Sequence, residues 1–164
     1  MDVLWSPWRY DYIKSGSETH ADNPGGCIFC DILNNPASDE EKFILERAGF
    51  NYVVLNIYPY ATAHLLIVPY EHLADLDKAD KQTTDEMMDL AKRCQTALRD
   101  VYDPHGFNMG LNIGKAAGAG VASHFHMHVL PRWYGDVNFM TSIAETRTLP
   151  ETLETTYSKL KGRI

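Results

Sequence analysis

The sequence contains no long apolar run, few cysteines and no excess of positive charge. No stretch approaches the roughly 20 apolar residues that a membrane helix needs, so we expect no membrane partner. Residues 1–12 lack the basic start and apolar centre of a secretory signal. Three cysteines, Cys27, Cys30 and Cys94, are a poor disulfide framework. These absences predict a protein of the reducing cytoplasm.

The net charge argues against one class of partner. The chain has 15 basic and 22 acidic residues, giving a formal net charge of −7. Polymeric nucleic acid is bound mainly through broad basic surfaces, so we expect no such partner. A small phosphorylated ligand stays compatible with this charge, because a local cluster of donors suffices to hold one phosphate.

The composition is that of a globular protein, with 45% hydrophobic and 23% charged residues. The length of 164 residues predicts a single domain over residues 1–164. An aromatic N-terminal arm, residues 1–26, contains Trp5 and Trp8 and ends in a loop rich in Ser, Asn, Gly and Pro. The main body begins near Cys27.

Five segments have the alternating or β-branched character of strands. They are residues 43–45, 52–57, 64–68, 107–113 and 124–130. A long helix is predicted over residues 83–102, where apolar residues recur at three- and four-residue spacing. Thr83 and Glu86 match a capping box at its start, and residues 150–160 predict a C-terminal helix. This order indicates an α+β fold on an antiparallel sheet.

Three histidines alternate along the last predicted strand. Because side chains of a strand point to opposite faces in turn, His124, His126 and His128 share one face, a solvent or ligand face. The other face carries Phe125, Met127 and Val129 and is expected to pack into the core. The histidines are compatible with plain surface polarity, with a three-histidine zinc or iron site, or with covalent catalysis by one imidazole.

A glycine-rich loop precedes the histidines. Residues 114–120 contain three glycines, three alanines and one lysine between two predicted strands, shortly after Asn112. Small residues let backbone N–H groups approach a ligand closely, as in a phosphate-binding nest. A flexible hairpin turn would have the same composition. The position next to three histidines favours phosphate binding.

Cys27 and Cys30 form a Cys-x-x-Cys pair after two glycines. Such a pair alone is compatible with redox activity, with simple burial or with zinc binding. Cys94 lies on the apolar side of the predicted long helix and is expected to be a core thiol.

The segment 124–130 matches the histidine-triad (HIT) signature, His-φ-His-φ-His-φ-φ, in which φ is apolar. The resemblance extends to residues 5–9, 56–60, 63–69, 106–108 and 131–139. The chain is therefore similar to the bacterial HIT branch that contains diadenosine polyphosphate phosphorylases and fragile-histidine-triad-like hydrolases. This resemblance implies a HIT-like α+β fold, with an antiparallel sheet, one long helix and a C-terminal helix. It also implies a homodimer whose subunits form one continuous sheet.

The resemblance also implies roles for individual residues. His126 would attack the α-phosphorus of a nucleotide and form a nucleotidyl-histidine, His128 would contact the phosphate or leaving group, and His64 would orient the cluster. Asn56 would hold the ribose hydroxyls. Asn112 would bind phosphate oxygens, together with the backbone of Gly118, Ala119, Gly120 and Val121. Relatives with a similar cysteine pair bind structural zinc, which would here be held by Cys27, Cys30, His72 and His124.

Several activities stay open. Many hydrolases of the family carry a glutamine in the loop before the triad, where this chain reads Gly118-Ala119-Gly120. Phosphorolysis of a dinucleoside polyphosphate therefore competes with hydrolysis. Nucleoside phosphoramidates and adenylyl-sulfate are alternative substrates, and a nucleotide-binding regulatory protein with little turnover is an alternative of another class. An iron or zinc enzyme using all three triad histidines is disfavoured, because their strand carries no carboxylate.

Overall fold

The computed structural model describes residues 26–136 and 149–164. The aromatic residues of the predicted N-terminal arm lie outside this range, and the single-domain organisation stays a prediction. The elements follow in the order α2 (Ile28–Asn34), β1 (Ile44–Arg47), β2 (Asn51–Leu55), β3 (Leu65–Pro69), η1 (Leu76–Lys78), α3 (Lys81–Tyr102), β4 (Gly106–Leu111), η2 (Lys115–Ala117), β5 (Met127–Arg132) and α5 (Leu153–Leu160).

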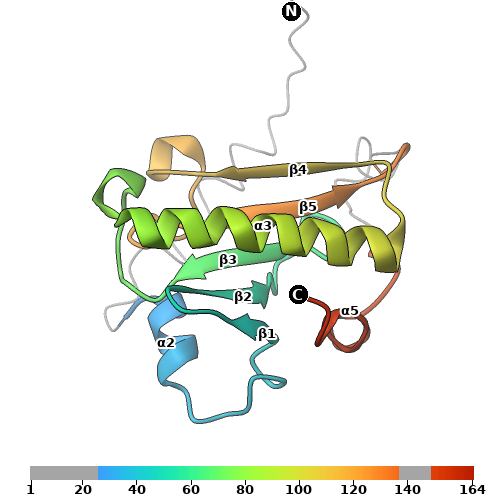
Figure 1. Ribbon diagram of the computed structural model, residues 1–164, viewed down its shortest axis with the longest axis horizontal. Helices are drawn as coiled ribbons and strands as arrows, with labels where there is room; N and C mark the ends of the chain where they lie inside the picture. Colours follow the sequence, from blue (N-terminus) through green and yellow to red (C-terminus); the bar gives the residue numbers. More distant parts are fainter. Residues whose placement is uncertain (1–25, 137–148) are drawn as a thin grey trace, which may run out of the picture.

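The five strands form one sheet in the order β1-β2-β3-β5-β4, and every neighbouring pair is antiparallel (Figure 1). All five predicted strands are confirmed, with their ends displaced by three residues at most. Strands β2 and β3 are buried along their whole length. Their continuous apolar sequences agree with this position, because a central strand covered on both sides needs no polar alternation.

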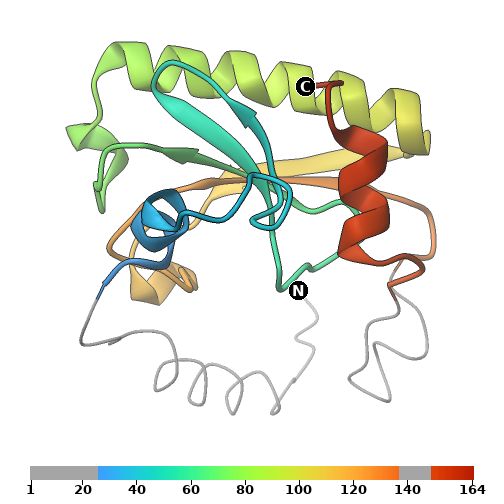
Figure 2. The same ribbon diagram turned by 90° about the horizontal axis from the view of Figure 1, so that it is seen from below.

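Helix α3 covers one face of the sheet, and α2 lies on the opposite side (Figure 2). The predicted apolar stripe of α3 is buried against the sheet, and Cys94 within it is a core thiol, as expected. Phe125, Met127 and Val129 belong to the same core cluster, so the predicted core face of the histidine strand is confirmed. The histidines consequently point to the α2 side.

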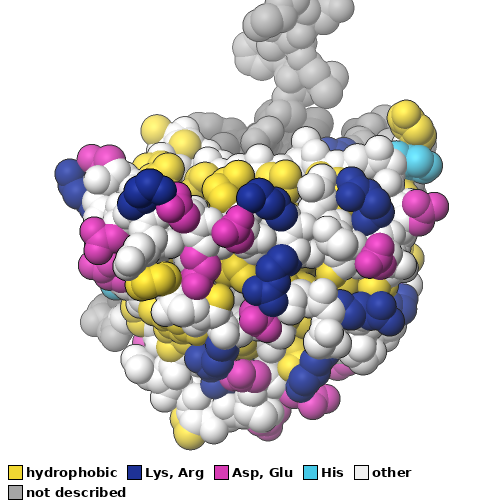
Figure 3. Space-filling model, viewed as in Figure 1, with side chains coloured by type: hydrophobic (Ala, Val, Ile, Leu, Met, Phe, Trp, Pro, Cys, Tyr) yellow, Lys and Arg dark blue, Asp and Glu magenta, His cyan; other side chains and the backbone are white. Residues whose placement is uncertain are grey.

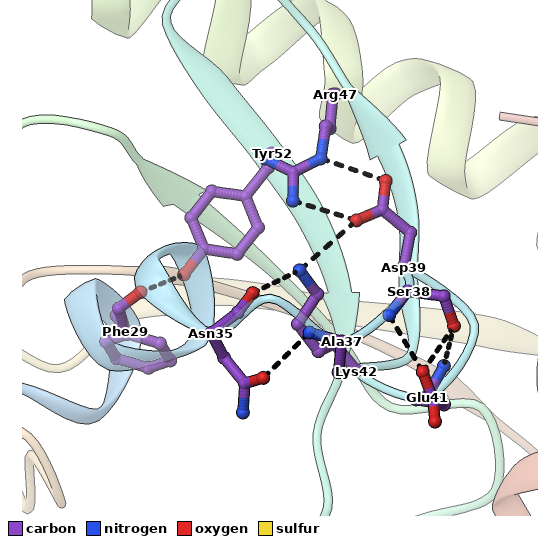
Figure 4. A network of polar contacts seen from close by, with 9 residues as sticks. All are labelled: Phe29, Asn35, Ala37, Ser38, Asp39, Glu41, Lys42, Arg47 and Tyr52. Carbon is purple, nitrogen blue, oxygen red and sulfur yellow. Dashed lines mark hydrogen bonds and ion pairs between the residues drawn. The ribbon is translucent and has the colours of Figure 1, made fainter.

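Helix α2 was not predicted from the sequence. It has only seven residues, and its buried residue is Phe29. The hydroxyl of Tyr52 on β2 donates a hydrogen bond to the Phe29 carbonyl at 3.1 Å (Figure 4). Phe29 and Tyr52 belong to a second apolar cluster with Ile44, Val54, Leu66 and Val68. The helix is therefore fixed by tertiary contacts with the sheet rather than by its own length.

Ion pairs fasten the segment that joins α2 to β1. The Arg47 guanidinium donates to both carboxylate oxygens of Asp39, at 2.9 and 2.8 Å (Figure 4). The Lys42 ammonium donates to the Asn35 carbonyl at 3.2 Å. Hydrogen bonds from Arg47 are the largest cause that lowers the pKa of Asp39. The segment thus keeps α2 close to the start of the sheet.

The predicted capping box of the long helix is wrong. Helix α3 begins at Lys81 after Asp80, and Thr83 lies buried inside it. The Glu86 carboxylate instead accepts backbone N–H bonds from residues 49–51 at 2.7–2.8 Å. These bonds join the β1–β2 turn to the helix, so a tertiary contact replaces the local one.

Acidic and basic side chains are interspersed over the face that carries α3 (Figure 3). The Lys92 ammonium, for example, lies 2.8 Å from Asp89, and Arg93 lies 3.3 Å from Glu46. This face therefore offers no continuous basic surface to a polyanion. Among the residues described, no helix combines the length and apolar character needed to span a membrane.

Candidate active site

The three triad histidines are buried on the α2 side of the sheet. His124 is fully buried, and His126 and His128 are 5% and 8% exposed. The sequence predicted their common face correctly, but that face is not open to solvent. The Phe29 ring of α2 covers it, with its centroid 5.5 Å from that of His124 and 4.8 Å from that of His126.

A chain of hydrogen bonds fixes the tautomers of two histidines. The backbone N–H of Tyr60 donates to His64 Nδ1 at 3.2 Å, and Asn56 Nδ2 lies at the same distance. Nδ1 of a neutral His64 therefore carries no proton, and its Nε2–H donates to His128 Nδ1 at 2.9 Å. The proton of a neutral His128 is consequently on Nε2, which forms no hydrogen bond within the described part of the chain.

The tautomer of His126 is fixed by its own strand. His126 Nδ1 lies 3.0 Å from the His124 carbonyl, which can only accept a hydrogen bond. Nδ1 therefore carries the proton and Nε2 has a free lone pair. The rings of His126 and His128 have centroids 4.8 Å apart. A nucleophilic nitrogen and an N–H donor are thus adjacent.

Burial keeps these imidazoles neutral. It lowers the pKa of His126, and it lowers that of His128 to about 4, with the neighbouring His126 as a smaller cause. Both rings are therefore uncharged near pH 7. A neutral imidazole is the form that attacks phosphorus.

Cys27, Cys30, His72 and His124 form a separate group. One potential ligand atom from each lies within 4.8 Å of all the others. His124 Nδ1 lies 3.3 Å from Cys27 Sγ and 3.7 Å from Cys30 Sγ, and His72 Nδ1 lies 3.4 Å from Cys30 Sγ. The sequence-predicted set of metal ligands is therefore brought together.

The donor set and its spacing fit a tetrahedral ion. With zinc–sulfur and zinc–nitrogen bonds of about 2.3 and 2.0 Å, sulfur and nitrogen ligands lie about 3.5 Å apart. His124 Nε2 lies 3.0 Å from the Pro69 carbonyl. This contact places the His124 proton on Nε2 and leaves Nδ1 directed at the thiols. In the described part of the chain, His126 and His128 belong to no such ligand group, so a three-histidine metal site is not formed.

The glycine-rich loop differs from an open nest. Gly118 has a positive φ of 84°, which suits glycine. The N–H groups of Gly118 and Ala119 already donate within the loop, to Lys115 and Gly114 carbonyls. In the described part of the chain, no backbone hydrogen bond engages the N–H groups of Gly120 and Val121. Phosphate binding by these four residues stays a prediction, and within it Gly120 and Val121 are the two whose N–H groups have no backbone acceptor among the described residues.

A cleft lies beside His128. Its walls are Tyr60, residues 108–112 of β4 and the following turn, and His128 and Leu130 of β5. Asn112, predicted to bind phosphate, lies in this cleft with His128. Asn56 lies instead beside His64, on the other side of His128. The predicted residues therefore surround the histidines from two sides.

Three features of the site were missed by sequence reasoning. Phe29 covers the histidines, and its position between the two cysteines was the available signal. Tyr60 stacks on His128 with centroids 5.8 Å apart. Arg132 is held by Asp136 through two hydrogen bonds and donates to Asn108. That pairing depends on the turn after β5 and has no local sequence signature.

Comparisons with known proteins agree with this geometry. A model of the HIT domain matches residues 38–134. The chain is 36% identical over 154 residues to an AP-4-A phosphorylase of Mycobacterium tuberculosis, covering 93% of this chain and 79% of that protein. It is also 26% identical over 141 residues to the protein hit of Bacillus subtilis, covering 84% and 94% of the two chains.

Solved structures give the same result. A Zn-bound histidine triad family protein from Mycobacterium smegmatis superposes with a TM-score of 0.68 and 28% identity, covering 84% of this chain and 92% of that one. A histidine triad nucleotide-binding protein from Sulfolobus tokodaii gives 0.67 and 25%, covering 84% and 91%. The chain belongs to the HIT family, and it is a HIT-family nucleotide hydrolase or phosphorylase.

Proposed function

We propose that the protein cleaves dinucleoside polyphosphates at the α-phosphate, with His126 as the covalent nucleophile. The observation that carries this proposal is the pair of fixed tautomers. His126 has a free lone pair on Nε2, and the neighbouring His128 has an unengaged Nε2–H. A nucleophile and a hydrogen-bond donor to the leaving oxygen are the two groups that this transfer through an imidazole uses.

The reaction has two steps. His126 Nε2 forms a bond to the α-phosphorus, and the bond from phosphorus to the leaving polyphosphate oxygen breaks. His128 donates a hydrogen bond from its Nε2–H to that oxygen, which leaves as the polyphosphate anion, while the adenylyl-histidine is an imidazolium. A phosphate oxygen, or a water that releases its proton to solvent, then attacks the phosphorus of the adenylyl-histidine, and the bond to His126 Nε2 breaks and returns the lone pair to that nitrogen. His64 keeps His128 in the required tautomer throughout.

Donors around the phosphate stabilise its developing charge. We propose that the N–H groups of Gly120 and Val121 and the side chain of Asn112 contact the phosphate oxygens. Gly118 and Ala119 then shape the loop through their internal bonds. Asn56, held beside His64, is proposed to bind the ribose. Its amide lies next to His64, on the side of His128 away from the β4 cleft.

Inorganic phosphate is the acceptor that we favour. The loop before the triad lacks the glutamine found in many hydrolases of the family. The Mycobacterium tuberculosis relative is named as a phosphorylase. Phosphate attack on the adenylyl-histidine would yield ADP, whereas water would yield AMP.

The test is product analysis with diadenosine tetraphosphate, with and without inorganic phosphate. Phosphorolysis predicts ADP and ATP only when phosphate is present. AMP and ATP without phosphate would establish hydrolysis instead. Cleavage of a nucleoside phosphoramidate or of adenylyl-sulfate, but not of the dinucleotide, would contradict the proposed substrate class.

We further propose that the group of Cys27, Cys30, His72 and His124 holds a structural zinc ion. Two thiols and two imidazoles form a closed donor set, which is typical of structural rather than catalytic sites. The spacing of the ligand atoms supports this, and so does the Zn-bound relative. The bound metal would join α2 to the segment before β5 and so brace the backbone that precedes His126.

A homodimer is proposed as the working assembly. Strand β4 lies at the edge of the sheet and pairs only with β5 among the described strands. Met109 on this edge is 47% exposed. Exposed edge strands pair readily with another copy, and such pairing would continue the sheet across two subunits.

A further inference from the structure

We infer that the cleft between β4 and His128 is the subsite for the leaving polyphosphate, and that Asn108 and Gly110 determine the size and charge of the leaving group. The inference rests on the proposed function and adds the leaving-group side of that site. The register of β4 and β5 places Gly110 opposite His128 and Asn108 opposite Leu130. The cleft therefore runs along the strand from Asn112, past His128, to Leu130.

The direction of the cleft suits the reaction. Residues two apart on a strand lie on the same face, separated by about 6.7 Å. His126, His128 and Leu130 thus follow one another along β5, from the nucleophile to the proton donor to the far end of the cleft. A group expelled from phosphorus at His126 would pass His128 and enter this space.

The polar groups of the cleft favour an anion. Arginine carries only donors, so the Asn108 atom that contacts Arg132 is Oδ1. Asn108 Nδ2 is turned away from Arg132, and no described residue accepts a hydrogen bond from it. His128 Nε2–H is the second available donor, and Asn112, proposed above to contact the α-phosphate, lies at the end of the cleft away from Asn108. Among the described residues, no carboxylate lines the cleft, although the chain as a whole is acidic.

A hydrogen bond from Arg132 keeps the Asn108 side chain in this orientation. Arg132 is fixed by two hydrogen bonds to Asp136, at 2.5 and 2.8 Å. Asp136 also accepts a hydrogen bond from the Trp133 N–H at 3.2 Å. The Arg132 guanidinium is therefore a rigid donor to Asn108 rather than a free phosphate ligand. Its role is to position the Asn108 amide toward the cleft.

Gly110 leaves the floor of the cleft open. A Cβ atom at this position would meet no atom within 4 Å, and the backbone there has no positive φ. The fold consequently does not require glycine at position 110. What glycine provides is space opposite His128, where a polyphosphate chain would lie.

The experiment uses Asn108→Asp and Gly110→Val in the full, metal-loaded chain. Asn108→Asp keeps the oxygen that Arg132 contacts but replaces the amide donor with a charge that repels anions. Gly110→Val keeps the donors and fills the space. Asn35→Asp is the matched control, because it makes the same change at an exposed position whose side-chain oxygen accepts from Ala37 N–H. Circular dichroism and melting temperature verify folding, and if Gly110→Val fails to fold, Asn108→Asp alone decides.

Two readouts are scored. Calorimetry with inorganic triphosphate should show affinity reduced at least about tenfold by Asn108→Asp and Gly110→Val, and by less than about twofold in Asn35→Asp. The ratio of kcat/KM for diadenosine tetraphosphate to that for adenosine 5′-phosphoramidate, whose leaving group is ammonia, should fall by a similar factor.

The outcomes separate the two proposals. Absence of triphosphate binding to the parent protein, or equal affinity in all variants, would overturn the subsite. Equal loss of kcat/KM for both nucleotides would also overturn it, while leaving the proposed function intact. If the parent cleaves neither nucleotide, the proposed function fails, and calorimetry still decides whether the cleft binds polyphosphate.

Discussion

At the scale of single residues, the burial of His128 affects both the charge of its imidazole and the stability of the protein. Burial lowers its pKa to about 4 in the folded protein, from 6.5 for the free side chain. The unfolded chain therefore takes up a proton at this position before the folded chain does. Stability from His128 is fully present above about pH 6.5 and is lost as the pH falls from there toward 4.

This linkage predicts the outcome of a denaturation series. The free energy of unfolding of the parent, measured in urea between pH 7.5 and 4, should fall more steeply with acidification than that of His128→Asn. The two curves should run parallel above about pH 7. A constant difference between parent and variant over the whole range would mean that the His128 pKa is not lowered by folding.

Some features of single residues in the site were predictable from the sequence, and others were not. Alternation alone placed His124, His126 and His128 on one face, because the period of a strand is two. It could not place Phe29 over them, since that contact joins residues about 97 positions apart in the chain. The tautomers depend on His64 and Tyr60 and are likewise set by tertiary contacts.

At the scale of elements, α3 and the β1–β2 turn form one unit through Glu86. Burial opposes ionisation of this carboxyl, but hydrogen bonds from Asn51 and from backbone N–H groups outweigh it and lower its pKa. Removing the carboxylate would leave the donors of residues 49–51 without their acceptor. The contact therefore contributes more than a surface ion pair does.

Glu86→Ala is accordingly expected to destabilise the protein by about 2 kcal/mol, or about 4 to 8 °C in melting temperature. Asp89→Ala, an exposed carboxylate on the same helix that pairs with Lys92, is the matched control and should cost well under 1 kcal/mol. Thermal unfolding by calorimetry measures both. Equal effects of the two substitutions would contradict the account of the turn.

Long periodic elements were predictable, and short ones were not. Helix α3 was found because its apolar stripe repeats over six turns, which few other structures imitate. Helix α2 escaped detection because seven residues contain too few turns for a pattern. The prediction of a capping box was wrong for a related reason. The local motif was present, but the Glu86 carboxylate accepts hydrogen bonds from backbone N–H groups of the β1–β2 turn instead.

At the scale of the whole molecule, the metal group joins α2 to the sheet. We predict about one equivalent of zinc per chain after purification without chelator. Removal of the metal should lower the melting temperature by at least about 10 °C, because the ligands cluster only in the folded state. His72→Ala should have a similar effect, whereas His105→Ala, at an exposed histidine, should not. Less than about a tenth of an equivalent of zinc would count against the site.

Assembly is the second property at this scale. A homodimer paired through β4 predicts a sedimentation mass near twice the 18.6 kDa of one chain. Replacing Met109 with Lys should shift the protein toward the monomer, because lysine on an exposed edge strand opposes pairing. A monomer at all concentrations in the parent would contradict the proposed dimer.

During turnover, we expect His126 to carry the nucleotide as an adenylyl group. The most direct measurement is mass spectrometry of the protein quenched while it cleaves diadenosine tetraphosphate, with fragmentation of the peptide that contains residues 124–128. We expect the mass of one adenylyl group on His126 and none on His124 or His128. We also expect that His126→Ala folds, forms no adduct and turns over no substrate. Normal turnover by that variant, or an adduct on another residue, would contradict covalent catalysis by His126.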